Sequence, residues 1–484
     1  MSSNELHRHV RRGDARRLRE LLGARAPARR VDVNAYDENG FTPLMVAVKT
    51  AAVDANLVRL LLAHGADVAA TSRCRYEADY PVLALALMSG DLHKVEALLE
   101  AGADLRYRRA HGYDALIDAV HGRDVVRDSR LLELLRVLIA RGAVLDGVTS
   151  YHESALRVLS RLGRFDAVAL LLEAGADASQ LKWTPLMRAV ALGSTGEVEA
   201  LLAAGGPLEE VDFWSRTAWL IAIQTGDIGK AALLRERGAS TSARGRCGMP
   251  PLFYAIGNHH AAMLRWLLDL GFGIEQTDDF GTTPLIAAVE ADDAEGARML
   301  LDAGATIDYE RNGQTALSHA RSPAIVSLLL DAGADPRFLS QEGRRTLLGF
   351  PGDADNDPLA DIRADDFLRA RTRRFGGRNP EPMDEPFWHA MIRAGVTGYA
   401  ATQWFKGPSS CGTTPVWCAQ RFGQSLTFLP DGRIVQIGGE HEDYYDPDFC
   451  IYNDVFSCTC REARSASSVI PRPTFRRRIS IARR

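Results

Sequence analysis

The sequence predicts a mainly α-helical repeat protein, a solenoid of stacked helix pairs, followed by a small, incomplete C-terminal module of mixed and largely β structure. Two tags that recur together predict the solenoid. One tag is Thr-Pro-Leu or a looser form of it, and it stands about 20 residues before most copies of the other tag. Two tags on one period indicate a structural repeat. The other tag, L-L-x-x-G-A or a close variant, occurs nine times, with its glycines at Gly65, Gly102, Gly142, Gly175, Gly205, Gly238, Gly271, Gly304 and Gly333.

Each Thr-Pro-Leu tag predicts the start of a first helix, and each glycine tag predicts the end of a second helix. Thr is a good N-cap, and the fixed φ and missing N–H of Pro suit the first helical turn. Glycine adopts the left-handed conformation that stops a helix. Each unit is therefore a helix pair that must stack on its neighbours to bury its apolar face. The Thr-Pro-Leu tags begin at Thr42, Thr184 and Thr283, with looser forms at Thr217, Pro250 and Thr315.

Over residues 4–336 the sequence resembles the ankyrin repeat family. The match is carried by DENGFTPLMVAV from residue 37 with LVRLLLAHGADV from residue 57, and by DFGTTPLIAAV from residue 279 with GARMLLDAGATI from residue 296. The resemblance implies a capping helix pair in residues 1–34 and an array of about nine repeats in residues 35–340. Two repeats depart from the pattern, because Pro81-Val82-Leu83 and Asp114-Ala115-Leu116 replace Thr-Pro-Leu.

The resemblance implies a protein–protein interaction scaffold that recognises a protein partner through the hairpin tips and the concave face of the first helices, without catalysis. Large aromatic residues stand close before several Thr-Pro-Leu tags, and such residues often dominate a binding surface. The alternative is that each aromatic side chain packs on the adjacent turn and belongs to the core. The predicted partner-binding residues are Phe41, Lys49, Trp183, Phe213, Trp214 and Phe280.

Composition and charge predict where the protein works. Residues 1–460 hold 50 basic and 61 acidic residues, a net charge of −11, so the body offers no broad surface for nucleic acid. The sequence has no run of 18 apolar residues, an odd number of Cys, and no signal-peptide core near its N-terminus. We therefore expect a cytoplasmic monomer that binds neither membrane nor cofactor. Arg makes up 53 of the 58 basic residues, which indicates a GC-rich and bacterial gene.

The pattern changes after the repeats. Residues 341–386 predict a linker with one helix near residues 361–374, and an aromatic-rich module follows in residues 387–456. Its predicted strands at 425–429, 433–437 and 450–456 resemble a single kelch repeat, one blade of a β-propeller, whereas a ring needs four or more blades.

The Arg-rich residues 457–484 predict a disordered or out-of-frame tail, since residues 461–484 hold eight Arg and one acidic residue. An alternative function follows from this interpretation. The chain would be the targeting arm of a larger ligand-binding or enzymatic β-propeller protein that a frameshift truncates.

Five further groups could suggest chemistry, and each has a simpler interpretation. The acidic cluster lacks the spacing of a calcium loop, and the Cys pairs lack that of a zinc knuckle. The adjacent His residues fit a turn between two helices, and the Arg run fits the predicted tail. No motif of a common enzyme class is present, so we predict no enzyme. These groups are residues 440–448, Cys411 with Cys418, Cys458 with Cys460, His259 with His260, and Arg476–Arg478.

Overall fold

The computed structural model forms two compact units, Met1–Leu270 and Gly271–Arg484, which are described separately. The residues that the structure describes are 4–23, 31–74, 77–122, 130–311, 313–335, 338–339, 359, 362–372, 381–382, 385–394, 398–405, 416–418, 421–422, 425–428, 433–438, 440–441, 454–459 and 466–469.

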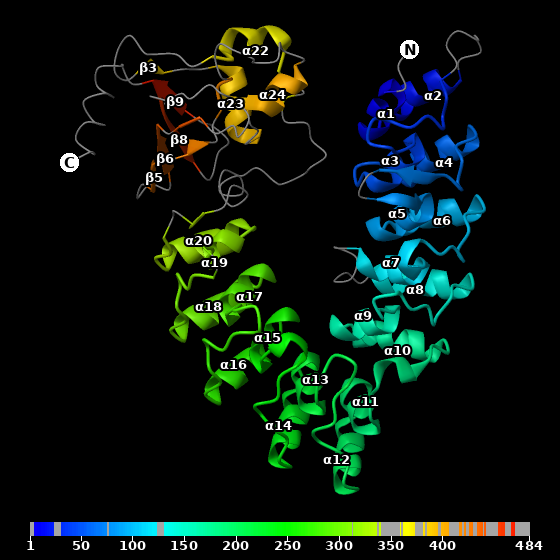
Figure 1. Cartoon of the computed structure of the whole chain (residues 1–484), viewed down its shortest axis with the longest axis vertical. Coiled ribbons are helices and arrows are strands. Elements are labelled where there is room, and N and C mark those ends of the chain that lie inside the picture. The colour runs from blue at the N-terminus through cyan, green and yellow to red at the C-terminus, as the bar shows by residue number, and fades with distance from the viewer. Residues whose placement is uncertain are drawn as a thin grey trace, which may run out of the picture. The chain divides into compact units, whose positions relative to one another are not determined.

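The first unit is a succession of helix pairs (Figure 1). A short antiparallel hairpin, β1 (Thr71–Arg73) with β2 (Ala78–Pro81), precedes the fifth helix. The helices are α1 (Asn4–Arg11), α2 (Ala15–Leu22), α3 (Pro43–Lys49), α4 (Ala55–Ala63), α5 (Val82–Ser89), α6 (Leu92–Glu100), α7 (Ala115–His121), α8 (Arg130–Ala140), α9 (Ala155–Arg161), α10 (Phe165–Glu173), α11 (Pro185–Leu192), α12 (Thr195–Ala203), α13 (Ala218–Thr225), α14 (Ile228–Glu236), α15 (Pro251–Gly257) and α16 (Ala261–Asp269), with 3₁₀ turns η3 (Ala178–Leu181) and η4 (Arg246–Gly248).

Both sequence tags act as predicted, which confirms the mainly α-helical repeat fold. Thr42 caps α3, since its side chain accepts a hydrogen bond from the Met45 N–H at 3.3 Å. Thr184 caps α11 and Thr217 caps α13 in the same way. All nine tag glycines have φ between 79° and 99°, and a Cβ at these positions would meet no atom within 4 Å. The backbone conformation, and not lack of space, therefore requires glycine.

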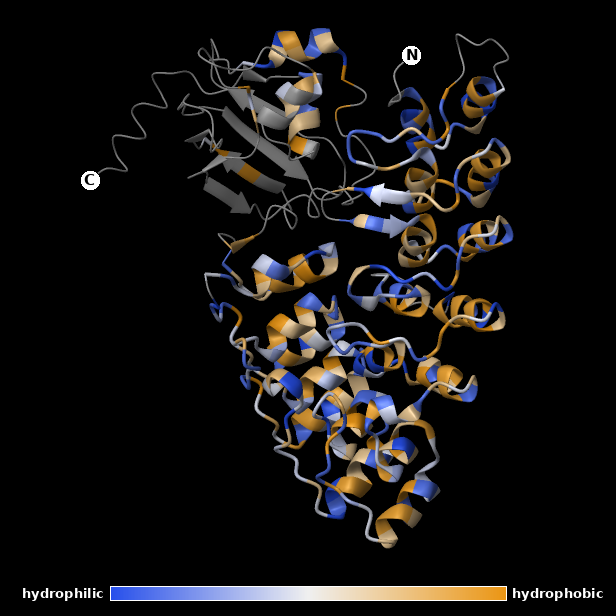
Figure 2. Ribbon diagram, turned by 45° about the vertical axis from the view of Figure 1, so that its right-hand side comes forward, coloured by the Kyte–Doolittle hydropathy of each residue, from blue (hydrophilic) through white to orange (hydrophobic). Residues whose placement is uncertain are grey.

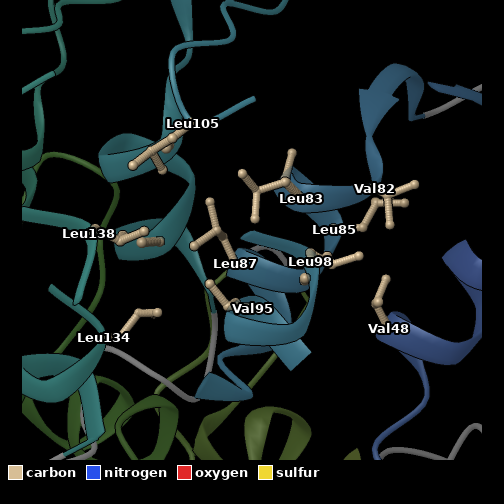
Figure 3. Packing of buried hydrophobic residues seen from close by; sticks show 14 of the residues in the cluster. Val48, Val82, Leu83, Leu85, Leu87, Val95, Leu98, Leu105, Leu134 and Leu138 are labelled. Carbon is tan, nitrogen blue, oxygen red and sulfur yellow. The ribbon is translucent and has the colours of Figure 1, made fainter. Parts of the chain in front are cut away.

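The apolar core runs continuously through the stacked pairs. Figure 3 shows Leu83 and Leu87 of α5 beside Leu98 of α6, with Leu134 and Leu138 of α8 at the next layer. All of these side chains are fully buried or nearly so. Figure 2 shows the hydrophobic colours concentrated on the helices. Each helix pair thus buries its apolar face against its neighbours, as a solenoid requires.

Buried lysines tie second helices to the ends of first helices in the preceding pair. The Lys94 Nζ on α6 donates to the Thr50 carbonyl at 2.8 Å, where α3 ends, and the side chain is 1% exposed. The Lys230 Nζ on α14 donates to the carbonyls of Val190 and Gly193 at 3.0 and 2.8 Å, at the end of α11. A cation at a helix C-terminus also interacts favourably with the negative end of the helix dipole. These lysines are therefore structural.

Replacing Lys94 by Met is expected to lower the free energy of unfolding by about 1–3 kcal/mol, because the buried Thr50 carbonyl loses its charged donor. Urea denaturation followed by circular dichroism measures the loss. The matched control is Lys182→Met, since Lys182 is an exposed lysine before α11. An equal loss in the two variants would contradict a structural role for Lys94.

The second unit begins with two further helix pairs, in which Thr283 caps the first helix. These are α17 (Pro284–Glu290) with α18 (Ala294–Asp302), and α19 (Ala316–His319) with α20 (Pro323–Asp331). Helices α22 (Ala364–Ala370), α23 (Pro386–Ala394) and α24 (Gly398–Trp404) follow, together with strands β3 (Glu381–Pro382), β4 (Arg421–Phe422), β5 (Ser425–Phe428), β6 (Arg433–Ile437), β7 (Glu440–His441), β8 (Asp454–Thr459) and β9 (Ala466–Val469).

The helix predicted within the linker belongs to the aromatic core of the module that follows it. On α22, Phe367 stacks on Phe405 with ring centroids 4.5 Å apart and meets Phe387 of α23 edge-on at 5.3 Å. The Trp388 indole on α23 stacks on Trp417 at 4.6 Å. The predicted boundary at residue 387 therefore differs from the structure, because the apolar face of α22 is buried against α23.

The C-terminal strands form a five-stranded sheet in the order β3-β9-β8-β6-β5, with all neighbours antiparallel. Strand β6 matches its predicted range. Strand β8 runs past the predicted end of the module at Phe456, because its ladder with β6 continues to the pair of Cys458 and Ile434. Strand β9 lies within the predicted tail and pairs with β8. The structure thus has strands where the sequence predicts disorder.

Candidate functional site

An aspartate organises the hairpin tip before several first helices. The Asp37 Oδ1 accepts hydrogen bonds from the N–H groups of Asn39 and Phe41 at 3.0 and 2.9 Å. The Asp278 Oδ1 accepts from Phe280 and Thr282 in the same way, so the turn begins one residue earlier than the matched segment from residue 279. These bonds fix the turn and leave the residue two positions after the aspartate at its tip.

Neighbouring tips are joined by backbone hydrogen bonds. The Arg73 N–H donates to the Gly40 carbonyl at 2.8 Å, and the Arg246 N–H donates to the Trp214 carbonyl at 2.9 Å. Gly40 has φ of 80°, and a Cβ there would lie 2.5 Å from the Arg73 carbonyl carbon. Each of these bonds holds two neighbouring tips in register.

Phe280 projects from its tip as predicted, since it is 61% exposed. At the first tip, the predicted residues Phe41 and Lys49 are brought together. The Lys49 Nζ lies 4.3 Å from the centroid of the half-buried Phe41 ring and forms an ion pair with Glu77. Phe41 packs against the main core, so only part of its ring is open to a partner.

Trp183 and Phe213 are half-buried. The Trp183 ring lies 6.0 Å from the Phe165 ring, and its indole N–H donates to the Asp212 Oδ2 at 3.4 Å. The Arg157 guanidinium lies over the Phe213 ring, 3.9 Å from the centroid. Both residues therefore combine packing with partial exposure.

Trp214 does not project, contrary to the expectation for a tip residue. It occupies the same position after Asp212 that Phe280 occupies after Asp278, yet only 7% of it is exposed. Its indole N–H donates to the Arg157 carbonyl on α9 at 2.8 Å. The difference arises because α9 lies over this tip and covers the Trp214 ring.

This hydrogen bond joins α9 to the turn before α13, which belongs to the helix pair two positions further along the chain. In a regular solenoid each repeat contacts only its neighbours. Here the Gln224 amide on α13 donates to the Arg161 carbonyl on α9 at 2.8 Å, and the Arg216 Nη1 donates to the Ser160 carbonyl at 2.7 Å. The α11–α12 pair between them is bridged. We call this junction of α9 with residues 212–224 the corner (Figure 1).

A buried ionic network holds the corner. Arg216 is 1% exposed and donates from Nε and Nη2 to the Asp212 Oδ2 at 2.9 and 2.5 Å. Its Nη2 also donates to the Ser160 Oγ at 2.5 Å, and its Nη1 also bonds the Gln224 side chain. A buried charge is tolerated only when it is paired and hydrogen-bonded in this way. Sequence reasoning missed this network, because Ser160 and Arg216 lie 56 positions apart in the chain.

Three guanidinium groups surround the aromatic pair at the corner. The Phe213 and Trp214 rings meet edge-on at 5.1 Å. Arg161 and Arg246 each lie 5.2 Å from the Trp214 ring centroid, while Arg157 covers Phe213. Burial lowers the pKa of the Arg157 guanidinium from its ordinary value. We call these five residues the cationic corner patch.

Some of the other candidate groups lie outside the described residues. His260 lies in the turn between α15 and α16, as expected. Its Nε2 is 3.0 Å from the Gln224 carbonyl. In the part of the chain that the structure describes, no cluster of three His, Cys, Asp or Glu residues is arranged to hold a metal. Within the same part, no helix is long and apolar enough to span a bilayer. The groups outside it are Cys411, Cys460, residues 442–448 and Arg476–Arg478.

Comparison with known proteins identifies the repeats. The family model of ankyrin repeats matches residues 6–108 and 252–339. A putative ankyrin repeat-containing protein of Treponema pallidum is 29% identical over 161 residues, which cover 32% of this chain and 54% of that protein. An ankyrin repeat, SAM and basic leucine zipper domain-containing protein of Colobus guereza is 37% identical over 83 residues, 16% of this chain and 18% of its own length.

Among solved structures, the ankyrin repeat domain of Bcl-3, an IkappaB family member, aligns with 23% sequence identity and a TM-score of 0.32 over 54% of this chain and 97% of that domain. The chain spans about half the length of the Treponema relative and less of the Colobus one. The segments matched by the family model carry the caps Thr42 and Thr283 and five of the nine tag glycines. Residues 6–108 and 252–339 of the chain therefore match ankyrin repeats.

Proposed function

We propose that the chain is a protein–protein interaction scaffold, which binds a protein partner through the hairpin tips and concave face of its ankyrin array and carries no catalytic function of its own. Ankyrin repeats generally mediate such interactions. The observation that supports the proposal most directly is Phe280, a large apolar side chain that is 61% exposed at an ordered tip. An exposed aromatic residue on a fixed backbone is a good anchor for a partner.

Other members of the predicted set support the same surface to different degrees. Phe41, Trp183 and Phe213 each offer part of a ring, and Lys49 offers a charge beside one of them. Trp214 is buried and supports the Arg161 and Arg246 side chains, which lie over its ring. The proposed partner-binding residues are therefore Phe280 in the second unit and, in the first unit, the half-exposed aromatic residues with the buried Trp214 that supports them.

Replacing Phe280 by Ala is expected to reduce partner capture about tenfold while changing the free energy of unfolding by less than about 0.5 kcal/mol, because the side chain is exposed. Affinity capture from native cells with quantitative mass spectrometry measures the first effect, and urea denaturation measures the second. Arg298→Ala is the control, since Arg298 is exposed on α18 of the same repeat. Equal capture by the two variants would count against a binding role for the tip.

A second candidate concerns the C-terminal module, as part of a larger ligand-binding or enzymatic β-propeller for which the array is a targeting arm. One observation favours it: strands β5, β6 and β8 form an antiparallel meander, as successive strands of a propeller blade do. Strand β9 pairs with β8 but lies in the tail that a frameshift would make foreign to the blade. Resequencing the gene across codons 456–484 tests it. An unshifted reading frame there would remove the proposed truncation by a frameshift.

A further inference from the structure

The cationic corner patch carries concentrated positive charge on a chain that is otherwise acidic. Residues 1–460 have a net charge of −11, yet Arg157, Arg161 and Arg246 gather around two adjoining aromatic rings. These arginines come from α9 and from η4, which are far apart in the sequence. The corner brings them together, because it places α9 over the tip that holds Phe213 and Trp214.

The charge of the patch is only partly compensated by the acidic groups that the structure describes around it. Asp212 is buried and forms an ion pair with the buried Arg216. Asp177 interacts electrostatically with Arg157, but its carboxylate also accepts hydrogen bonds from Ser179. Glu153 lies 3.8 Å from the Arg161 Nη1, but it also lies 3.4 Å from the His121 Nε2. The Arg161 side chain is 46% exposed and Arg246 is exposed as well. The patch therefore presents a net positive and accessible surface.

The aromatic rings position all three guanidinium groups, and hydrogen bonds fix Arg157 in addition. The Arg157 guanidinium donates to the carbonyls of His152 and Gln180 at 2.7 and 2.9 Å, which fixes it over the Phe213 ring. A guanidinium that lies over an aromatic ring keeps N–H donors at its edge, and this edge can grip a carboxylate with two hydrogen bonds. Side chains already held in place lose little entropy when a ligand binds.

We infer that the cationic corner patch binds an acidic peptide segment of a protein partner, with carboxylates on Arg161 and Arg246 and an apolar side chain against the exposed part of Phe213. The inference rests on the proposed function and specifies the chemistry of the partner. A short segment is favoured over a nucleic acid, because the surrounding acidic body repels a long polyanion while the patch attracts a few carboxylates.

The test uses the full-length chain and a fluorescein-labelled 12-residue peptide, three copies of Asp-Glu-Leu-Gly, with a matched peptide of Asn-Gln-Leu-Gly. Fluorescence anisotropy gives the affinity of each. The double variant Arg161→Glu with Arg246→Glu is expected to bind the acidic peptide about 30-fold more weakly. The control Arg235→Glu with Arg265→Glu changes the net charge equally at exposed positions of α14 and α16, and is expected to stay within about twofold of the original chain.

Three results would overturn the inference. One is an equal loss in the two double variants whose circular dichroism and melting temperature match the original chain. Another is equal binding of the acidic and the neutral peptide. The third is displacement of the labelled peptide by a 12-nucleotide oligo-dT at the concentration at which unlabelled acidic peptide displaces it. That result would make the patch a general polyanion site.

Partner capture separates this inference from the proposed function. Lower capture by Arg161→Glu with Arg246→Glu, but not by the control pair, supports the inference. Unchanged capture by that folded variant overturns the inference and leaves the proposed function standing. A chain that binds the acidic peptide but captures no protein would support the patch chemistry and contradict the proposed function.

Discussion

Replacing Arg216 by Met is expected to lower the free energy of unfolding by about 3–5 kcal/mol, since removal of one partner leaves a buried charge unpaired. Asp212 is 4% exposed and would keep its carboxylate beneath the corner without the guanidinium that now binds it twice. The Ser160 carbonyl and the Gln224 side chain would lose donors as well. Urea denaturation followed by circular dichroism measures the effect.

The matched control is Arg188→Met, because Arg188 is an exposed arginine on α11, the helix that the corner bridges. It is expected to change stability by less than about 0.5 kcal/mol. Hydrogen exchange adds a local reading: Arg216→Met should speed exchange in residues 157–163 and 212–224 before it affects α3 to α6. Unchanged exchange at the corner, with full stability, would show that Arg216 does not hold α9 to α13.

Trp214→Ala is expected to cost about 3–5 kcal/mol of stability, as for other large aromatic side chains removed from a core. The ring is 7% exposed, donates a hydrogen bond to α9 and supports two guanidinium groups. Phe280→Ala, at the equivalent tip position, should leave stability nearly unchanged because that ring is exposed. Thermal melting of the two variants in parallel measures the contrast.

A Trp214→Ala chain that melts with the original chain would contradict the core assignment and would return Trp214 to the exposed binding surface. Partner capture by Trp214→Ala alone cannot decide the matter, because a loosened corner would also disturb Phe213 and Arg161. Trp214→Phe is the useful companion. It keeps most of the ring, loses the hydrogen bond to the Arg157 carbonyl, and is expected to cost about 1 kcal/mol.

The repeat fold could be predicted from the sequence because its determinants are local. A Thr N-cap, a Pro in the first turn and a left-handed glycine act within a few residues, and they recur on a regular period. The structure confirms them at Thr42, Thr184 and the nine tag glycines. The lysines that cap preceding helices were not predicted, since Lys94 and Thr50 lie 44 residues apart.

The site could be predicted only in part, because exposure at a tip depends on what packs over it. Phe280 and Trp214 occupy the same turn position, so their position in the turn does not separate them. The corner decides the difference, and it depends on Arg216 and Gln224 reaching Ser160 and Arg161 across an intervening helix pair. One signal was present in the sequence: Arg216 stands directly before Thr217, at the position that Phe41 holds before Thr42. In the structure this arginine is buried.

The most direct test of the proposed function is site-specific photo-crosslinking in native cells. Benzoylphenylalanine replaces Phe280 at the tip or, in a separate chain, Arg298 on the outer helix of the same repeat. The proposed function predicts a discrete protein adduct from position 280 that is absent from position 298. The same adducts from both positions, or none from position 280 in a folded chain, would contradict it.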